Sequence, residues 1–289
     1  MPRPISVDRV DLNLAGTVAL VTGGGRGFGR VVSHGLATAG AAVALTGRST
    51  EHLTATVREI EADGGTALAI PMDVSDPGAV NTGVAEAAQK LGPIDLLVNN
   101  AGLNGPLGPV WEVDHEAWWH AVEVNLRGVM LCSAAVMPAM VERGSGRVVN
   151  VVSHAGVFRW PNMSAYSASK AAVVKLTENQ AYEARRHGVT VFAVHPGVLP
   201  IGLSEEVFSH RGAPEGTYES KMVAWLQRQF DEGNVVQPEQ GADLIARIAA
   251  GDLDALTGRY LKADDDVAQL LADAPDITAE DRLTLRLRD

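Results

Sequence analysis

The sequence has little cysteine, few aromatic residues and fewer basic than acidic side chains. Cys132 is its single cysteine, so no disulfide can form within the chain and no cysteine cluster can hold a metal. The chain has 24 Lys and Arg against 35 Asp and Glu, a formal net charge of −11. This charge disfavours nucleic acid and anionic membranes as partners, because phosphate groups would be repelled. The lone cysteine favours a reducing, cytoplasmic location.

Long apolar runs are also missing. No run of about 20 apolar residues is evident, and segment 1–16 mixes charged with isolated apolar residues, unlike the apolar core of a signal peptide. We therefore expect a soluble protein without a membrane span. At 289 residues, 46 % of them hydrophobic and 20 % charged, the chain is long enough for one large domain with a substantial core.

Short apolar runs alternate with segments of helical character along most of the chain. We expect strands at residues 18–21, 43–46, 67–70, 94–98, 148–152, 189–194 and 256–261. We expect helices after the first strand and at residues 50–62, 77–91, 114–122, 123–142, 164–187 and 238–250. Strands separated by such helices form a parallel sheet covered on both faces. The sequence therefore predicts a single doubly wound α/β domain of Rossmann type over residues 1–289.

A glycine-rich turn follows the first expected strand. It reads Thr22-Gly23-Gly24-Gly25-Arg26-Gly27-Phe28-Gly29, and apolar residues with helical spacing follow it. Glycines at this place let the backbone approach a pyrophosphate at the positive end of a helix. Glycine-rich turns are common, but the position between a strand and a helix favours a phosphate-binding site.

A second pattern consists of Ser153, Tyr166 and Lys170. Tyr166 and Lys170 are four residues apart on an expected helix, so their side chains lie on one face. A phenol titrates near ~10 in water, and a nearby ammonium lowers that pKa. The Ser153 hydroxyl can hold a substrate oxygen against the phenol. The arrangement suits proton transfer to or from an alcohol oxygen, although this Tyr and Lys spacing alone is common.

Taken together, the motifs resemble one family. The glycine-rich turn, Asp73-Val74, Asn99-Asn100-Ala101-Gly102, Asn125, Ser153, Tyr166-x-x-x-Lys170 and Pro196-Gly197 occur in the order of the classical short-chain dehydrogenases/reductases. The resemblance covers about residues 14–261, and the three residues between Gly23 and Gly27 fit the classical rather than the extended branch. It implies an NAD(P)-dependent oxidoreductase that interconverts a secondary alcohol and a ketone by hydride transfer.

The resemblance also implies a role for each matched residue. Tyr166 would be the general acid/base, Lys170 would bind the nicotinamide ribose and lower the pKa of Tyr166, Ser153 would position the substrate oxygen, and Asn125 would support a water chain. Cofactor contacts are expected at Thr22, Gly23, Gly25, Arg26, Gly27, Phe28, Gly29, Arg48, Ser49, Asp73, Val74, Asn100, Ala101, Gly102, Tyr166, Lys170, Pro196, Gly197, Val198 and Ile201.

One position departs from the family pattern. Where the family often has a threonine that contacts the nicotinamide carboxamide, this chain has Ile201. Backbone groups of residues 198–201 could still orient the ring, or Ser204 could substitute.

The phosphorylation state of the cofactor depends on the residues after the second strand. An NAD site usually places a carboxylate there to hold the ribose hydroxyls, whereas this chain has Gly47 followed by Arg48. A guanidinium can make charge-assisted hydrogen bonds to a phosphate. We therefore expect NADP to be preferred, with Arg26 and Ser49 as helpers. The alternative is that Arg48 stacks on the adenine and that NAD is accepted too.

The substrate contacts are the least constrained by the sequence. Segment 203–231 is either a substrate lid or a pair of helices packed on the surface. His154, Phe158 and Trp160 could line a pocket with Leu103, Asn104 and residues of segment 203–231, which favours an apolar or ring-bearing carbonyl compound. Alternatively, Phe158 and Trp160 pack in the core or against a neighbouring subunit. His195 is expected to be structural, because Tyr166 already fills the role of the base.

Other activities remain open beside a dehydrogenase acting on a small carbonyl or alcohol substrate. A cofactor-sensing regulatory protein would have no need of Ser153, Tyr166 and Lys170, and an isomerase or dehydratase would use the same site. Family likeness suggests a homotetramer or homodimer formed through helices 123–142 and 164–187. In the C-terminal tail, residues 264–289, the triplet Asp264-Asp265-Asp266 is expected to form a turn or helix cap rather than a metal site.

Overall fold

Seven parallel strands form one sheet in the computed structural model, which describes residues 12–287. The strands are β1 (Val18–Thr22), β2 (Ala42–Gly47), β3 (Thr66–Pro71), β4 (Leu96–Asn99), β5 (Gly146–Val151), β6 (Val189–His195) and β7 (Tyr260–Lys262). Their order across the sheet is β3-β2-β1-β4-β5-β6-β7. The doubly wound parallel sheet predicted from the sequence is confirmed.

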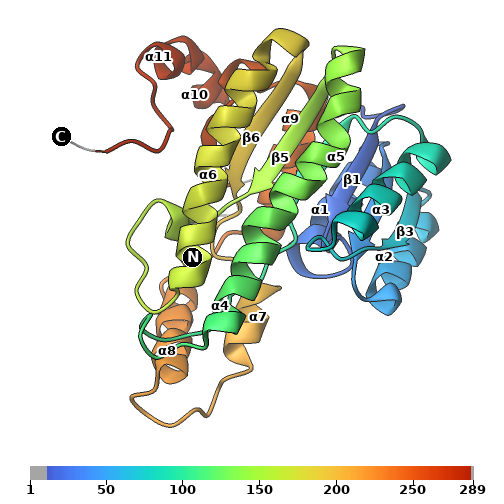
Figure 1. Cartoon of the computed structure of the whole chain (residues 1–289). Helices are drawn as coiled ribbons and strands as arrows, with labels where there is room; N and C mark the ends of the chain where they lie inside the picture. The colour runs from blue at the N-terminus through green and yellow to red at the C-terminus, as the bar shows by residue number, and fades with distance from the viewer. Residues whose placement is uncertain (1–11, 288–289) are drawn as a thin grey trace.

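Helices cover both faces of this sheet (Figure 1). One face carries α1 (Gly27–Thr38), α2 (Thr50–Ala62) and α9 (Pro238–Ala250), and the other carries α3 (Pro77–Leu91), α5 (Gly128–Arg143) and α6 (Ser164–Ala184). Successive side chains of a strand point to opposite faces. Ala19 and Val21 of β1 therefore pack with α1 and α9, whereas Val18 and Leu20 pack with α3 and α5.

Several helices begin at residues that the sequence marks. Asp76 accepts hydrogen bonds from the backbone N–H groups of Gly78 (2.7 Å) and Ala79 (3.3 Å), and Pro77 occupies the first turn of α3. Both features stabilise a helix start. Asp266 caps α10 (Val267–Ala272) in the same way, so the last residue of the acidic triplet is a helix cap, as expected.

A π-helical turn, Glu123–Arg127, joins α4 (His115–Val122) to α5 in one continuous helical run. Such wide turns occur mostly at functional sites. The run of residues 115–143 is long and apolar enough to cross a membrane by length and composition, which the sequence analysis did not anticipate. However, 44 % of its most apolar stretch is buried inside the fold, where α5 packs against α3 and the sheet. Packed in this way, the run resembles the core helix of an α/β protein.

The C-terminal third differs most from expectation. Segment 203–231 forms two helices, α7 (Leu203–Phe208) and α8 (Tyr218–Asp231), joined by a loop. The last strand begins at Tyr260 rather than at residue 256, because a 3-10 turn, Asp254–Leu256, precedes it. The parts of the sequence predictions that concern residues 1–11 and 288–289 lie outside the described residues.

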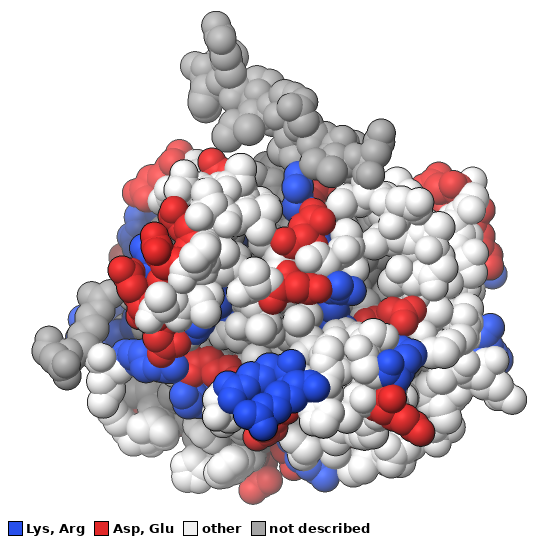
Figure 2. All heavy atoms as spheres, turned by 90° about the horizontal axis from the view of Figure 1, so that it is seen from above, with Lys and Arg blue, Asp and Glu red and all other residues white. Residues whose placement is uncertain are grey.

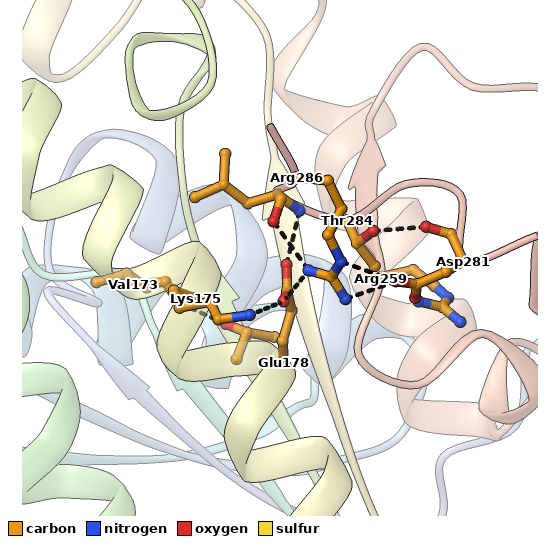
Figure 3. A network of polar contacts seen from close by, with 9 residues as sticks. Val173, Lys175, Glu178, Arg259, Asp281, Thr284 and Arg286 are labelled. Atoms are coloured by element: carbon orange, nitrogen blue, oxygen red, sulfur yellow. Dashed lines mark hydrogen bonds and ion pairs between the residues drawn. The ribbon is translucent and has the colours of Figure 1, made fainter. Parts of the chain in front are cut away.

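The tail contains α10 and α11 (Ala274–Ala279) and then returns to the sheet, where the carbonyl of Leu283 accepts a hydrogen bond from the N–H of Tyr260 (2.8 Å). Arg286 then reaches Glu178 of α6 (2.6 Å), and Asp281 pairs with both Arg286 and Arg259 (Figure 3). These contacts connect the tail to α6 and to the strand β7.

Charged side chains are scattered over the face shown in Figure 2, where acidic and basic groups alternate with uncharged ones. The basic groups on this face form no continuous track.

The strand order creates a crevice at one edge of the sheet. The chain runs outward from β1 to β3 and then returns to β4 on the other side of β1, so the loops after β1 and β4 diverge. Ligands of open α/β sheets bind where the strand order reverses in this way. The glycine-rich turn after β1 and the loop after β4 both line a cavity of about 620 Å³ at this place.

Candidate active site

The glycine-rich turn is fixed against the loop after β4. Thr22 Oγ1 accepts hydrogen bonds from the backbone N–H groups of Asn100 (2.9 Å) and Ala101 (3.0 Å). Asn100 Nδ2 donates to the carbonyls of Thr22 (2.9 Å) and Gly23 (3.3 Å). A Cβ at Gly29 would collide with the Gly23 carbonyl oxygen and lie 2.5 Å from Asn100 Nδ2. Glycine is therefore required at position 29 for the turn to keep this shape.

The first turn of α1 opens onto the cavity without a capping side chain. Its N-cap residue is Arg26, whose side chain makes no capping hydrogen bond. Gly25, Gly27, Phe28 and Gly29 line the cavity beside it. The first N–H groups of a helix lack partners, and the helix dipole favours negative charge there. The pyrophosphate of a dinucleotide fits this place both sterically and electrostatically.

The residues that follow β2 and β3 also line the cavity. Arg48 is exposed and lines it beside Ser49, whose hydroxyl caps α2 by accepting a hydrogen bond from His52 N (3.3 Å). Asp73 Oδ1 accepts hydrogen bonds from the Ser75 hydroxyl (2.7 Å) and backbone N–H (2.9 Å). The hydroxyl hydrogen bond is the main cause that lowers the pKa of Asp73, and the charge of Arg48 contributes less. Val74 also lines this part of the cavity.

Ser153, Tyr166 and Lys170 meet at the other end of the cavity, as the sequence predicted. Ser153 follows β5, and its hydroxyl lies near enough to the Tyr166 phenol to lower the pKa of that phenol. Lys170 Nζ lies 5.8 Å from the centre of the Tyr166 ring and donates a hydrogen bond to the Val151 carbonyl (2.8 Å). The structure thus brings together a phenol, a hydroxyl and an amine in the ligand cleft.

Burial dominates the protonation of this group. It raises the pKa of Tyr166, and the hydrogen bond with Ser153 opposes that change. It lowers the pKa of Lys170 to about 8, because a buried charge loses its hydration. The lowering of the Tyr166 pKa that the sequence predicted is not found, because burial outweighs the opposing effect of Ser153.

Asn125 lies in the π-helical turn and is fully buried. Its Oδ1 accepts a hydrogen bond from Leu103 N (2.8 Å), and its Nδ2 donates to Leu103 O (2.9 Å) and Ser169 Oγ (3.1 Å). A Cβ at Gly102 would lie 3.2 Å from Asn125 Oδ1 and 3.8 Å from Lys170 Nζ. Asn125 therefore holds the loop after β4 close to Lys170. The predicted water chain through Asn125 stays a prediction.

The segment after β6 closes this end of the cavity. Pro196, Gly197, Val198 and Ile201 line it, and Val198 O accepts a hydrogen bond from Val236 N (2.9 Å). Ile201 also packs against the hydrophobic core. An apolar side chain thus occupies the position where the family often has threonine, and Ser204 of α7 lines the cavity nearby.

His195 is the last residue of β6 and is 7 % exposed. Its ring stacks on His154 with the ring centres 4.3 Å apart. Burial lowers the pKa of His195 to about 3, so the ring is neutral near pH ~7. A base that weak fits the structural role expected from the sequence.

The remaining wall of the cavity contains residues that sequence reasoning missed. Leu103, Asn104, His154 and Trp160 line it as expected. Phe158 does not line it, because its side chain is 59 % exposed and packs edge-on against His154. As predicted, segment 203–231 also contributes to the wall, whereas Met163 of the β5–α6 loop was not singled out; the segment's residues are Leu203, Val207, Met222, Trp225, Leu226 and Gln229. For that segment the sequence indicated the whole stretch rather than the individual residues that face the cavity.

Comparison with known proteins identifies relatives of this arrangement. The chain is 35 % identical over 278 residues to a short chain dehydrogenase of Pseudocercospora fijiensis (strain CIRAD86), covering 93 % of this chain and 87 % of that protein. It is 41 % identical over 236 residues to 2-dehydro-3-deoxy-L-rhamnonate dehydrogenase (NAD(+)) of Sphingomonas sp. (strain SKA58), covering 82 % and 89 %. A crystal structure of an actinorhodin polyketide ketoreductase variant with NADPH matches with a TM-score of 0.78 and 33 % identity, covering 85 % of this chain and 95 % of that one.

The family model described as short chain dehydrogenase matches residues 17–212, which include the glycine-rich turn and Ser153, Tyr166 and Lys170. The chain therefore belongs to the short chain dehydrogenase family and is an NAD(P)-dependent oxidoreductase that acts on small molecules.

Proposed function

We propose that this enzyme interconverts a secondary alcohol and a ketone, with NADP as its preferred cofactor and Tyr166 as the general acid/base. The meeting of Ser153, Tyr166 and Lys170 at one end of the cofactor cleft carries this proposal. The bound cofactor supplies or accepts the hydride. The Ser153 hydroxyl holds the reacting oxygen, and the Tyr166 phenol donates a proton to it or removes one.

The pKa directions support proton donation by Tyr166. Burial raises the pKa of the phenol, so the proton stays on Tyr166 near neutral pH until a carbonyl oxygen begins to gain negative charge. Lys170, whose pKa is about 8, is mainly charged at that pH. The Ser153 hydroxyl, which lowers the pKa of Tyr166 against the effect of burial, stabilises the phenolate that remains after the proton has left.

The preference for NADP is supported by the residues at the end of β2. Gly47 ends the strand, so no carboxylate is present there to repel a phosphate, and Arg48 lines the cavity directly after it. Arg30 of α1 is already paired with Glu59 of α2 (2.8 Å), so its charge is balanced within the protein. The ketoreductase relative of known structure was determined with NADPH, whereas the rhamnonate dehydrogenase relative is named for NAD(+).

A Tyr166→Phe substitution tests the proposal. Removing the hydroxyl should reduce carbonyl reduction by at least ~10²-fold, the contribution typical of acid/base catalysis, while the Kd for NADPH measured by fluorescence changes little. The matched control is Tyr182→Phe, because Tyr182 lies on the same helix, is 66 % exposed and does not line the cavity. Full turnover in Tyr166→Phe would remove this residue from the mechanism. Product formed without consumption of NADPH would indicate isomerisation or dehydration instead.

A further inference from the structure

The cavity wall beyond the catalytic group has more apolar than polar side chains. They come from the β5–α6 loop and from segment 203–231, which lie far apart in the sequence. The wall includes the apolar side chains of Trp160, Met163, Val207, Met222, Trp225 and Leu226. Unlike a sugar site, this wall offers few hydrogen-bond partners and a large area for apolar contact.

Two indole rings join the two halves of this wall. Trp160 of the β5–α6 loop and Trp225 of α8 meet edge to face, with the ring centres 4.7 Å apart and an angle of 79° between the ring planes. Aromatic pairs of this geometry are favourable, so the contact holds α8 over the end of the cavity. Met163 and Met222 lie in the same wall, and flexible thioethers pack well against flat rings.

The polar groups of this wall are already paired or uncharged. Asn104 Nδ2 donates to Leu203 O (3.2 Å) and Glu206 Oε2 (3.3 Å). Burial lowers the pKa of His154, with the charge of Lys262 adding to the effect, and burial also lowers the pKa of His195, so neither ring carries a charge near neutral pH. Gln229 is the remaining polar side chain that segment 203–231 contributes besides Ser204.

Within the described residues, the cations that line the cavity belong to the cofactor-binding and catalytic groups, and the wall beyond Tyr166 has none. The cavity lining includes Arg26 of the glycine-rich turn, Arg48 after β2 and Lys170, which is bonded to the Val151 carbonyl. Arg159 is next to Trp160 in sequence but is exposed and does not line the cavity. The carboxylate of a sugar acid at this wall would lose its hydration and gain no charged partner, which is costly.

We infer that the substrate of this enzyme is an uncharged, ring-bearing ketone, or the corresponding alcohol, whose ring packs against Trp160 and Trp225. This inference rests on the proposed function and adds the substrate class to it. The carbonyl oxygen lies between Ser153 and Tyr166, and the apolar ring extends toward α8. A sugar acid, the kind of substrate named for one relative, does not suit this wall.

A panel of three ketones tests the substrate class. Methyl naphthyl ketone should be reduced with a kcat/KM at least about tenfold above that of a straight-chain decanone and of ketogluconate, because only the first offers a flat apolar ring. Higher kcat/KM for ketogluconate or for decanone, still lost in Tyr166→Phe, would overturn the substrate class and leave the proposed function intact. No reduction of any of the three, with NADPH or NADH, would overturn both.

Substitutions of Trp225 test the residue that we assign to the ring. Trp225→Ala should lower kcat/KM for methyl naphthyl ketone by about 10- to 100-fold, mainly through KM, as expected for lost apolar burial. It should change kcat/KM for the small ketone butanone by less than about threefold, and Trp225→Phe should restore most of the loss. The matched control is Trp111→Ala, because Trp111 is 79 % exposed and does not line the cavity. Equal losses for both ketones in Trp225→Ala, with NADPH affinity retained, would overturn the assignment.

Discussion

Tyr166 and Lys170 are one helical turn apart on α6, and burial shifts both toward their neutral forms. The sequence places the two side chains on one face of a helix, but it carries no measure of how deeply that face is buried. Parts of the fold distant in sequence bury the pair, and Lys170 donates a hydrogen bond to the Val151 carbonyl, so the fold decides in which direction both pKa values shift.

Arg48 is the residue whose substitution separates the two cofactors. Arg48→Ala should raise the KM for NADPH by about 10- to 100-fold, since hydrogen bonds to a charged group contribute about 1.5–3 kcal/mol. The KM for NADH should change by less than about threefold. Steady-state kinetics with both cofactors measures this difference. Arg58→Ala is the control, because Arg58 is exposed on the neighbouring helix α2 and does not line the cavity. Equal losses for both cofactors would contradict the phosphate contact.

His195 should make the folded protein sensitive to acid. Its folded pKa is about 3 against an ordinary value of 6.5, so between these values the unfolded chain binds a proton that the folded chain excludes. Stability from this group is fully present above about pH 6.5 and falls as the pH decreases, by about 2 kcal/mol at about pH 5. Urea unfolding of the wild type and of His195→Asn, each at about pH 7 and at about pH 5, measures the effect. An identical pH dependence in the two proteins would contradict it.

At the scale of the elements, the C-terminal tail connects β7 to α6. Glu178 of α6 accepts hydrogen bonds from Lys175 Nζ (2.7 Å), Leu285 N (2.6 Å) and Arg286 Nη1 (2.6 Å), as Figure 3 shows. Leu285 also packs against a small apolar cluster of α6 and the sheet. Although the ion pairs are partly exposed and individually weak, the tail adds an apolar contact and a backbone hydrogen bond to β7.

Removal of residues 281–289 should therefore lower the thermal stability. We expect a decrease in Tm of about 5 °C, because the loss of about 2 kcal/mol in a chain of this size corresponds to that shift. Differential scanning calorimetry measures it. Arg282→Ala is the control, since the ion pair of Arg282 within residues 12–287 is with the exposed Glu280 (3.2 Å). An unchanged Tm in the truncated chain would show that the tail does not stabilise the fold.

At the scale of the whole molecule, α5 presents an apolar face to its surroundings. Residues 128–141 contain no charged side chain, yet Met130 is 42 % exposed and Ala134, one turn later, is also exposed. An uncharged outward helix face of this kind is typical of a contact between subunits. A second copy of this chain is the partner that we propose, in a homodimer or homotetramer that includes α5 and α6.

A double substitution of this face tests the assembly. Met130→Glu combined with Ala134→Glu should dissociate the oligomer, since like charges would meet at the contact and lose their hydration. Sedimentation velocity should then give a smaller species than for the wild type. Leu271→Glu is the control, because Leu271 is a comparably exposed apolar residue on α10. A wild-type protein that sediments as a monomer would contradict the proposal.

Local patterns were sufficient for much of the fold. Asp76 and Pro77 mark the start of α3 correctly, and the apolar runs locate seven strands, because caps and periodicity depend on neighbouring residues. The π-helical turn that carries Asn125 and the late start of β7 at Tyr260 were not predicted. Both depend on packing against distant parts of the chain.

The sequence by itself determined the strand and helix alternation, the glycine-rich turn and the pairing of Tyr166 with Lys170, because each follows from residues close together along the chain. Only the tertiary structure decided which side chains line the cavity, such as Trp225, which packs against Trp160. It also decided that burial raises the pKa of Tyr166. The lining of the cavity depends on contacts between segments far apart in sequence, and the pKa shift depends on how deeply the phenol is buried. Local patterns of residues encode neither the contacts nor the burial.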